Sequence, residues 1–405
     1  MAAFLINGDC IFTYDELLSF INNNRSYYPL YKTHELYAFF SNLVKALANG
    51  YPLVLLDSDI NMSEIDGIDK SSVNTPVCKP FRKFRSINEM IDALLQSESE
   101  ITIFTSGTTG QPKKVIHTIS SLTRSIRKGN KYQEKVWAFA YNPTHMAGLQ
   151  VFFQAFANQN TLVNVFNLTR SEVYNQIATH KITHLSATPT FYRLLLPFEK
   201  EYPFLQRVTL GGEKSDNHLY ESIHKIFPNA KINNVYASTE AGSLLAAKGN
   251  CFQLPKRNQD VLQIVNDELL IHRSLLGQSN DIKFDGDYYH TGDLIEWVNK
   301  EEGIFKFKSR LNELINTGGY KVNPNEVENR LNAIDGVRQS LVYGKANSVL
   351  GNVLCADIQL EDNCTLTELD IRHQLKDQLQ DFKIPRKIKF VESFDLTRTG
   401  KLKRI

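Results

Sequence analysis

The sequence predicts a layered α/β fold with a largely parallel sheet, followed by a smaller α+β domain. From about residue 30 to residue 245, short apolar segments alternate with segments of helical periodicity, a pattern typical of strands joined by crossover helices. Between residues 262 and 308 the pattern changes to short alternating segments with turns, which indicates a small antiparallel β subdomain. Beyond residue 310, helical and strand patterns follow one another again.

The length of the chain favours at least two domains. At 405 residues it is too long for one ordinary hydrophobic core. We therefore expect a large N-terminal domain over residues 1–309, made of layered α/β subdomains and the antiparallel β subdomain. Residues 310–405 are expected to form a small α+β C-terminal domain, which lies within the usual size range of domains.

The elements of the N-terminal domain follow from apolar residues at helical spacing and from short β-branched or aromatic runs. Several of the predicted strands end in Gly, Pro or Ser-Thr, as strand ends that face a ligand often do. Helices are predicted at residues 34–49, 87–96, 171–180 and 217–226, and strands at residues 52–56, 101–104, 136–141, 161–166, 182–186, 207–210 and 232–236.

The C-terminal domain is predicted to contain two helices and two strands. The second helix is expected to open with Thr365 and Thr367 together with Glu368, because hydroxyl and carboxylate side chains cap the first turn of a helix. The helices are predicted at residues 325–333 and 365–379, and the strands at residues 336–344 and 353–360.

Charge and cysteine usage narrow the class of protein. The 46 basic and 44 acidic residues nearly balance, which gives no reason to expect nucleic acid or an acidic membrane surface as the main partner. Residues 138–169 lack charged side chains, but Asn, Gln and His interrupt them too often for a membrane span. No secretory signal is visible at the N-terminus. The five cysteines are scattered without a C-x-x-C pair, so we expect a cytoplasmic enzyme with buried thiols.

The first motif is a loop suited to phosphate. Residues 102–114 read Thr-Ile-Phe-Thr-Ser-Gly-Thr-Thr-Gly-Gln-Pro-Lys-Lys, a buried-strand pattern that breaks into small hydroxyl residues, two glycines and a lysine. Hydroxyl groups and glycine backbone N–H groups bind anions, and Lys113 supplies positive charge. A Walker loop needs four residues between its glycines, whereas two intervene here, so a conventional P-loop kinase or NTPase is disfavoured.

Four further clusters follow along the chain. Residues 235–242, Val-Tyr-Ala-Ser-Thr-Glu-Ala-Gly, place an aromatic ring, hydroxyls and a carboxylate at a strand end, where Glu240 could hold Mg²⁺. Residues 289–293 end in Asp293, whose carboxylate could accept both hydroxyls of a ribose. Residues 308–319 contain Arg310 and a glycine pair, and residues 397–401 end in Lys401.

With these motifs in order, the chain resembles the adenylate-forming superfamily of acyl-CoA and aryl-CoA synthetases, peptide-synthetase adenylation domains and luciferases. The resemblance covers nearly the whole chain. It implies ATP, Mg²⁺ and either CoA or the phosphopantetheine of a carrier protein as cofactors, with a small carboxylic acid as substrate. It also implies that the C-terminal domain is a mobile lid that carries the catalytic lysine.

The resemblance assigns a role to each motif. Tyr236 would stack on adenine, Thr239 would lie near phosphate, and Glu240 would bind Mg²⁺, while Ser238 would be a further nucleotide-binding residue. Asp293 with Arg310 would hold the ribose, and Lys401 would bridge the acid carboxylate and the α-phosphate. Cations and a metal are the largest available stabilisers when two anions must react. The loop that would close over the β- and γ-phosphates comprises Thr105, Ser106, Gly107, Thr108, Thr109, Gly110 and Lys113.

An acid pocket is also implied. Residues 142–148, Asn-Pro-Thr-His-Met-Ala-Gly, resemble the Pro-x-x-His-x-x-Gly segment of acyl- and aryl-CoA synthetases, which places His145 near the carboxylate. Amino-acid-activating relatives have an Asp there, and its absence disfavours an α-amino acid, whose ammonium would be buried unpaired. Both a flat aryl acid and a slim alkyl acid remain open. The other expected pocket residues are Met146, Ser186, Gly211, Gly212 and Ala237.

The second half-reaction has its own expected residues. In the family the lid swings after adenylation about a hinge two residues beyond the motif arginine, which is Asn312 here, and Gly318 and Gly319 match the pair flanking the thiol channel. The sequence therefore predicts an acid–thiol ligase that forms an acyl-adenylate and then a thioester with CoA. Transfer to a carrier protein is the close alternative, and a catalytically silent nucleotide-binding regulator is a more distant one.

The chain departs from the family pattern at a few positions. The first motif lies unusually close to the N-terminus, so the first subdomain is expected to be abbreviated. Ala237 stands where Gly is usual in the adenine motif, Ser309 precedes the motif arginine in place of Gly, and Asp395 stands where Pro is common. None of these changes removes a charged catalytic group.

Overall fold

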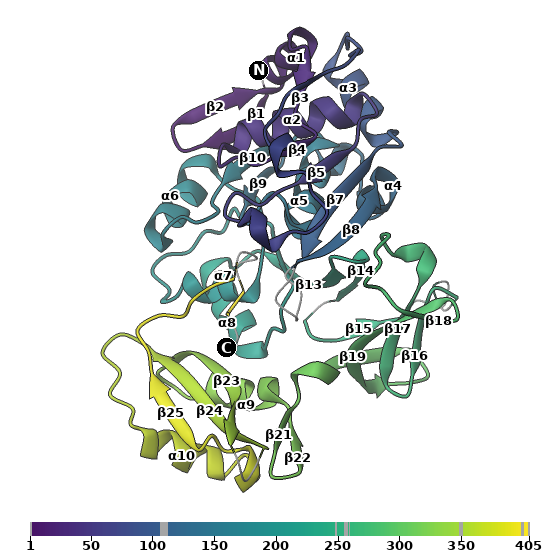
Figure 1. Cartoon of the computed structure of the whole chain (residues 1–405). Coiled ribbons are helices and arrows are strands. Elements are labelled where there is room, and N and C mark those ends of the chain that lie inside the picture. Colours follow the sequence, from purple (N-terminus) through teal and green to yellow (C-terminus); the bar gives the residue numbers. More distant parts are fainter. Residues whose placement is uncertain are drawn as a thin grey trace.

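The computed structural model describes residues 2–105, 112–247, 249–254, 258, 260–347, 351–397 and 401–403. It confirms the expected fold class. A layered α/β part occupies the top of Figure 1, an antiparallel sheet the lower right, and a small α+β part the lower left. No helix among the described residues has both the length and the apolar content needed to cross a membrane.

The largest sheet has eight strands in the order β14-β13-β12-β11-β9-β10-β1-β2. Its inner neighbours are parallel, and only the two edge strands pair antiparallel. The strands are β1 (Ala3–Asn7), β2 (Cys10–Thr13), β9 (Val136–Phe139), β10 (Thr161–Asn164), β11 (His184–Ala187), β12 (Arg207–Gly211), β13 (Lys231–Ser238) and β14 (Gly242–Ala247).

Both faces of this sheet are buried, which is the usual condition of a parallel sheet. Side chains of one strand alternate between the two faces, so Ala138 of β9 joins one hydrophobic cluster and Phe139 joins the other. Helices α6 (Arg170–His180), α7 (Pro189–Leu194) and α8 (Asn217–Ile226) contribute to the first cluster, and α2 (Leu36–Ala48) and α5 (Met146–Phe156) contribute to the second.

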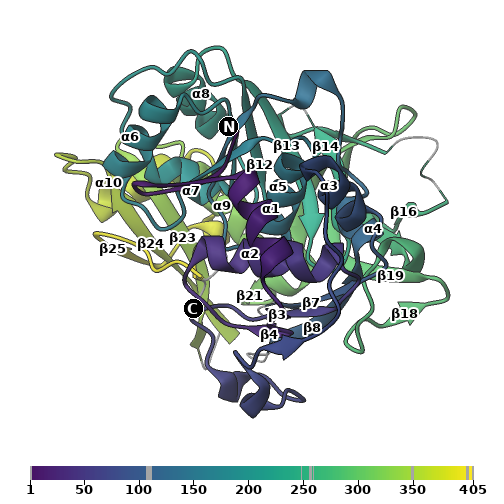
Figure 2. The ribbon, with the colours of Figure 1, turned by 90° about the horizontal axis from the view of Figure 1, so that it is seen from above.

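A second sheet lies beyond α2 and α5. It has the order β4-β5-β7-β8 and shares its hydrophobic cluster with those helices. Helix α2 is buried on nearly all sides, as expected for a helix between two sheets (Figure 2). The strands are β4 (Leu30–Tyr31), β5 (Leu53–Leu55), β7 (Glu100–Thr105) and β8 (Lys113–Thr118), and α1 (Tyr14–Asn23), α3 (Ile87–Leu95), α4 (Ile119–Thr123) and the β3–β6 pair (Ser26–Tyr27, Val77–Cys78) complete this part.

The expected antiparallel subdomain is a sheet with the order β15-β20-β19-β17-β16, to which β18 adds at β19. The hydrophobic cluster on its inner face includes Leu262, Ile271, Ile295 and Phe305. The strands are β15 (Phe252–Gln253), β16 (Leu262–Val265), β17 (Glu268–His272), β18 (Phe284–Asp285), β19 (Tyr288–Asn299) and β20 (Ile304–Arg310).

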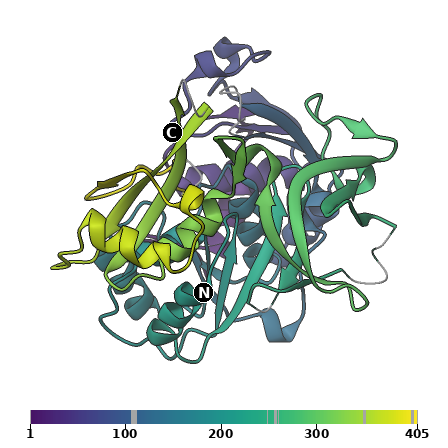
Figure 3. The same cartoon turned by 90° about the horizontal axis from the view of Figure 1, so that it is seen from below.

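The last part of the chain packs α9 (Pro324–Leu331) and α10 (Glu368–Lys376) on a five-stranded sheet with its own hydrophobic cluster. It lies beside the antiparallel sheet when the molecule is seen from below (Figure 3). The strands are β21 (Ile315–Thr317), β22 (Tyr320–Val322), β23 (Val337–Asn347), β24 (Gly351–Leu360) and β25 (Lys387–Phe390), with β25 parallel to β24.

Several elements differ from the sequence expectation. The first residues of the chain form β1, β2 and α1, and β1 pairs in parallel with β10 inside the main sheet. Strand β8 and helix α5 were not predicted. Helix α10 begins after Thr367, whose capping-box partner is Asp370 rather than Glu368, because the box requires a carboxylate three residues after the cap.

Candidate active site

The candidate site lies at the carboxyl edge of the main sheet. Neighbouring parallel strands end at the same edge, so the segments that follow them are brought together. Many of the expected pocket and nucleotide residues are the last residues of these strands or follow directly after them. They occupy residues 140–146 after β9, residues 186–190 at the end of β11, residues 211–213 at the end of β12 and residues 236–240 at the end of β13.

The predicted ribose pair is formed across two adjacent strands. Asp293 of β19 lies opposite Arg310 of β20 in the sheet register, and Arg310 Nε lies 2.9 Å from Asp293 Oδ1. The Tyr236 hydroxyl donates to Asp293 Oδ2 over 2.6 Å. Burial raises the pKa of Asp293, while Arg310 and the Tyr236 hydroxyl oppose that rise. Three predicted site residues from three strands therefore meet at one carboxylate.

Tyr236 carries two contacts. Its ring stacks on Phe307 with the ring centres 4.3 Å apart and the planes 16° from parallel. Burial, followed by the charge of Asp293, raises the pKa of Tyr236 well above that of an exposed phenol, so the hydroxyl remains a donor. One ring face of Tyr236 is thus occupied by Phe307. Phe307 was missed in the sequence, although the alternating aromatic pattern of β20 marks it as inward-facing.

The turn that contains Thr239 and Glu240 is held by hydrogen bonds to three successive backbone carbonyls. The Thr239 carbonyl lies 2.7 Å from His117 Nε2, the Glu240 carbonyl accepts from Gly277 N over 2.7 Å, and the Ala241 carbonyl accepts from Arg124 Nη2 over 2.6 Å. Burial lowers the pKa of His117, which favours the neutral ring with its proton on Nε2. None of these three anchoring residues was predicted.

The other residues of this turn have local partners. Ser238 Oγ accepts from Ala241 N over 3.2 Å, so its hydroxyl also supports the turn. Within the described residues, no three His, Cys, Asp or Glu side chains gather as a metal site. A single carboxylate such as Glu240 can bind Mg²⁺ only together with other oxygens, such as those of substrate phosphates.

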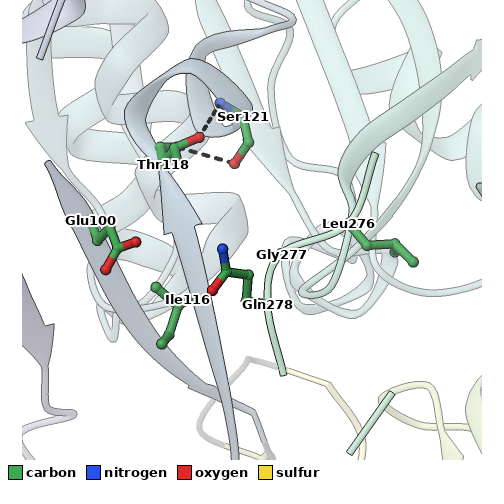
Figure 4. A pocket seen from close by; sticks show the side chains of 7 residues that line it. All are labelled: Glu100, Ile116, Thr118, Ser121, Leu276, Gly277 and Gln278. Atoms are coloured by element: carbon green, nitrogen blue, oxygen red, sulfur yellow. Dashed lines mark hydrogen bonds between the residues drawn. The ribbon is translucent and has the colours of Figure 1, made fainter. Parts of the chain in front are cut away.

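A small cavity of about 70 Å³ lies behind the same turn, between Ile116 and Gln278 (Figure 4). Ser121 and Gly277 also line it. Its volume is far below the several hundred Å³ of a typical ligand pocket. The cavity therefore belongs to the packing around the turn, and none of the predicted substrate residues lines it.

His145 is held by a buried carboxylate from the other sheet. It is the residue before α5, and its Nε2 lies 3.4 Å from Oδ2 of Asp57, which follows β5. Asn142 Nδ2 donates to the same oxygen over 2.8 Å. Gly148 allows the tight turn into α5, because a Cβ there would lie 2.4 Å from the Asn142 carbonyl oxygen. Asp57 was missed as a site residue, since its partner is 88 residues away.

The remaining expected pocket residues lie around this edge. Met146 is buried, and its sulfur would lie 3.7 Å from a Cβ at Gly242. Ser186 is buried and hydrogen-bonded to the Tyr141 hydroxyl. Ala237 pairs with Ser243 across the β13–β14 ladder. These predicted substrate residues are thus small or apolar.

Lys401 reaches the same edge from the far end of the chain. A Cβ at Gly212, where φ is +83°, would lie 3.3 Å from Lys401 Cε and 3.7 Å from its Nζ. Leu402 N donates to Glu213 Oε1 over 3.3 Å. Burial lowers the pKa of Lys401, and the charges of Glu213, Glu313 and Glu240 oppose that change. Gly212, predicted as part of the pocket wall, therefore also lies against the predicted catalytic lysine.

The other predicted residues are only partly placed. Thr105 and Lys113 face each other at the end of the β7–β8 ladder, so the ends of the phosphate loop are adjacent. Ser106, Gly107, Thr108, Thr109 and Gly110 lie outside the described residues. Asn312 lies in the 3-10 turn Leu311–Glu313, and Gly318 and Gly319 form the turn between β21 and β22 with φ of +57° and +84°.

Known proteins with similar sequences and folds identify the family of this chain. The fold is that of an adenylate-forming enzyme, as the sequence resemblance implied. Residues 62–264 match the model of the AMP-binding enzymes, and residues 326–401 match that of the AMP-binding enzyme C-terminal domain. The chain belongs to the AMP-binding enzyme family.

Two curated relatives show where the chain stands in the family. It is 29% identical to a 2-succinylbenzoate–CoA ligase of Staphylococcus epidermidis, over 75% of this chain and 68% of the relative. It is 26% identical to a peroxisomal trans-cinnamate:CoA ligase of Petunia hybrida, over 75% of this chain and 60% of that protein.

Solved structures agree on the fold. The o-succinylbenzoate CoA synthetase of Bacillus subtilis in complex with its acyl-adenylate intermediate has a TM-score of 0.72 at 19% identity, covering 99% of this chain and 94% of that one. The anthranilate CoA ligase AuaEII in complex with anthranoyl-AMP has a TM-score of 0.76 at 17% identity, covering 99% and 92%.

Proposed function

We propose that this protein is an AMP-forming acid–thiol ligase. A carboxylate oxygen attacks the α-phosphorus of ATP, the bond to the β-phosphate oxygen breaks, and pyrophosphate leaves. The sulfur of CoA then attacks the acyl carbon, AMP leaves, and the thiol proton is released to solvent. The observation that carries the proposal is Lys401 lying on Gly212, at the sheet edge where Asp293, Arg310 and Tyr236 already meet.

The side chains supply binding, orientation and charge. Asp293 and Arg310 would hold the ribose, and Tyr236 would stack on the base with the ring face opposite Phe307. Glu240 would bind Mg²⁺, whose charge lowers the cost of bringing two anions together. Lys401 would lie between the carboxylate and the α-phosphate, where its charge stabilises the transition state. No nucleophilic side chain is needed.

The acid is proposed to be aromatic, or a short to medium alkyl acid. The small and apolar walls formed by Met146, Ser186, Gly211 and Ala237 support a slim substrate, and the names of the two relatives support an aryl acid. His145, held by Asp57, would face the carboxylate.

The division after residue 309, the hinge at Asn312 and the thiol channel beside Gly318 and Gly319 are part of the proposal. The short turn Leu311–Glu313 between β20 and β21 supports a hinge there, because few residues join the two sheets. We also propose a cytoplasmic location, which the five free cysteines support. The expectation of buried thiols was wrong for Cys10, Cys78 and Cys251, which are exposed, and only Cys355 is buried.

The test is pyrophosphate exchange with a panel of aryl, short-chain and medium-chain acids, followed by CoA addition. Acid-dependent exchange, CoA consumption and AMP release are expected. If exchange occurs without CoA consumption but a holo-carrier protein is loaded, the acyl acceptor is the carrier protein and not CoA. ADP as product, or no exchange with any acid, would contradict the proposal.

A further inference from the structure

We propose that Glu213 is a positioning residue that holds the Lys401 hairpin in the adenylation arrangement and connects it to the wall of the acid pocket. By the Lys401 hairpin we mean residues 395–397 together with residues 401–403, which are hydrogen-bonded to each other. This inference rests on the proposed function and goes beyond it, because the proposed function assigns no role to Glu213. The two oxygens of its carboxylate accept from two segments that are far apart in the sequence. Oε2 accepts from Thr190 N over 3.0 Å, and Oε1 accepts from Leu402 N over 3.3 Å.

The pocket side of this bridge is buried. Thr190 is 1% exposed and lies in the first turn of α7, where backbone N–H groups have no partner inside the helix. Thr188 already caps α7 by accepting from Phe191 N, so Glu213 is not its only N-terminal partner. The hydrogen bond from Thr190 N holds one oxygen of the Glu213 carboxylate at α7, and the second oxygen accepts from the tail.

On the tail side, hydrogen bonds join two neighbouring segments. Thr397 N donates to the Lys401 carbonyl over 2.7 Å, Lys401 N donates to Thr397 Oγ1 over 3.2 Å, and Lys403 N donates to the Asp395 carbonyl over 2.9 Å. These bonds tie residues 395–397 to residues 401–403. A hydrogen bond at Leu402 consequently fixes the depth at which the neighbouring Lys401 side chain enters the site.

Charge adds to this geometry. The charged groups around Lys401 are Glu213, Arg310, Glu313 and Glu240, and Glu213 is the strongest of the carboxylates that counter the fall in the pKa of Lys401 caused by burial. Replacing Glu213 by Gln keeps the shape but removes this charge. The pKa of Lys401 should then fall further, so the lysine loses its proton at a lower pH.

The experiment compares Glu213→Gln with wild type and with Glu221→Gln, a carboxylate on the exposed side of α8. Two half-reactions are measured: acid-dependent pyrophosphate exchange, and thioester formation from supplied acyl-adenylate and CoA. We expect exchange to fall about 10-fold to 50-fold, mainly in kcat, as for loss of a charge-assisted hydrogen bond. Thioester formation should stay within about 2-fold, and the alkaline limb of exchange should move to lower pH.

The variant Glu213→Asp separates the effect of the carboxylate charge from the effect of the side-chain length. It should restore the position of the alkaline limb but leave exchange slow, because the shorter side chain cannot reach both N–H groups. Equal loss in both half-reactions, or an unchanged exchange rate and pH profile, would overturn the inference.

A measurement without turnover keeps this test separate from the proposed function. Hydrogen exchange of the peptide spanning residues 395–403 should be faster in Glu213→Gln than in wild type and unchanged in Glu221→Gln. If wild type catalyses no exchange with any acid but the tail loses protection in Glu213→Gln, the proposed function fails and the bridge stands. If the protein is active and the tail is unaffected, the bridge fails alone.

Discussion

Two cation–carboxylate arrangements face the candidate site, and they are built in opposite ways. Asp293 and Arg310 lie on adjacent strands of one hairpin, 17 residues apart in the chain, with 2.9 Å between their charged atoms. Glu213 and the Lys401 hairpin come from segments 189 residues apart, and a 3.3 Å hydrogen bond from Leu402 N to Glu213 Oε1 joins them.

The difference indicates which part of the site is permanent. A pair fixed by strand register exists whenever the antiparallel sheet is folded. A pair formed by the chain end exists only while the C-terminal part is docked on the main sheet. We therefore expect the first pair to serve both half-reactions and the second to serve only adenylation, as in gating by a closing domain.

The largest expected effect is that of Lys401→Ala. Pyrophosphate exchange should fall about 10²–10³-fold, because a positive charge aimed at the transition state is lost. Thioester formation from supplied acyl-adenylate should be nearly unchanged. Lys403→Ala is the matched control, since that side chain is exposed two residues away. Equal loss in both half-reactions would break the comparison.

Asp293→Asn should affect both half-reactions. The amide keeps the shape but loses the charge that pairs with Arg310 and that would accept the ribose hydroxyls. A loss of about 3 kcal/mol corresponds to a rise of roughly 100-fold in KM for ATP. Asp287→Asn is the control, because Asp287 is exposed and pairs with Arg273. A defect confined to adenylation would show that nucleotide binding differs between the two steps.

Tyr236→Phe should have a smaller effect of the same kind. It removes the 2.6 Å bond to Asp293 but keeps the stacking on Phe307 and the pair with Arg310. A loss of about 1.5 kcal/mol predicts a rise of roughly 10-fold in KM for ATP. Titration of the nucleotide by calorimetry would check the same change without turnover. An unchanged affinity would mean that the hydroxyl does not orient Asp293.

Gly212→Ala should have the smallest effect on rate. The new Cβ would lie 3.3 Å from Lys401 Cε, at the flexible end of a side chain that can shift by a few tenths of an ångström. We expect exchange to fall about 3-fold and stability to fall by about 1 kcal/mol, since φ is +83°. Gly8→Ala, with φ of +60° and open space around it, isolates the backbone cost. Denaturant midpoints and exchange rates of both variants separate the two effects.

The nucleotide side of the site was largely predictable from the sequence. Asp293, Arg310 and Tyr236 lie in motifs whose order along the chain indicated the family, and the structure brings all three together. Local patterns also marked most strands and helices of the main sheet. Whether these residues have the predicted roles is what the substitutions above test.

The residues that were missed depend on contacts that no local pattern encodes. Asp57 approaches His145 only because two sheets pack around α2 and α5, and His117 reaches the Thr239 carbonyl from 122 positions away. The N-terminal strands were missed because β1 enters the main sheet by pairing with β10, a segment far away in the sequence. Such long-range contacts carry no periodic signal of their own.

The register that places Asp293 opposite Arg310 also constrains how the hairpin can change in length. Both residues lie well away from the turn around residues 300–303, and irregularities already interrupt the register at Leu294/Ile295 and at Trp297/Asn299. An insertion in one strand between the pair and the turn would need a matching insertion in the other, whereas residues added within the turn would leave the pair intact. Length variation among homologues should therefore concentrate in this turn, which is also the place to graft a reporter peptide.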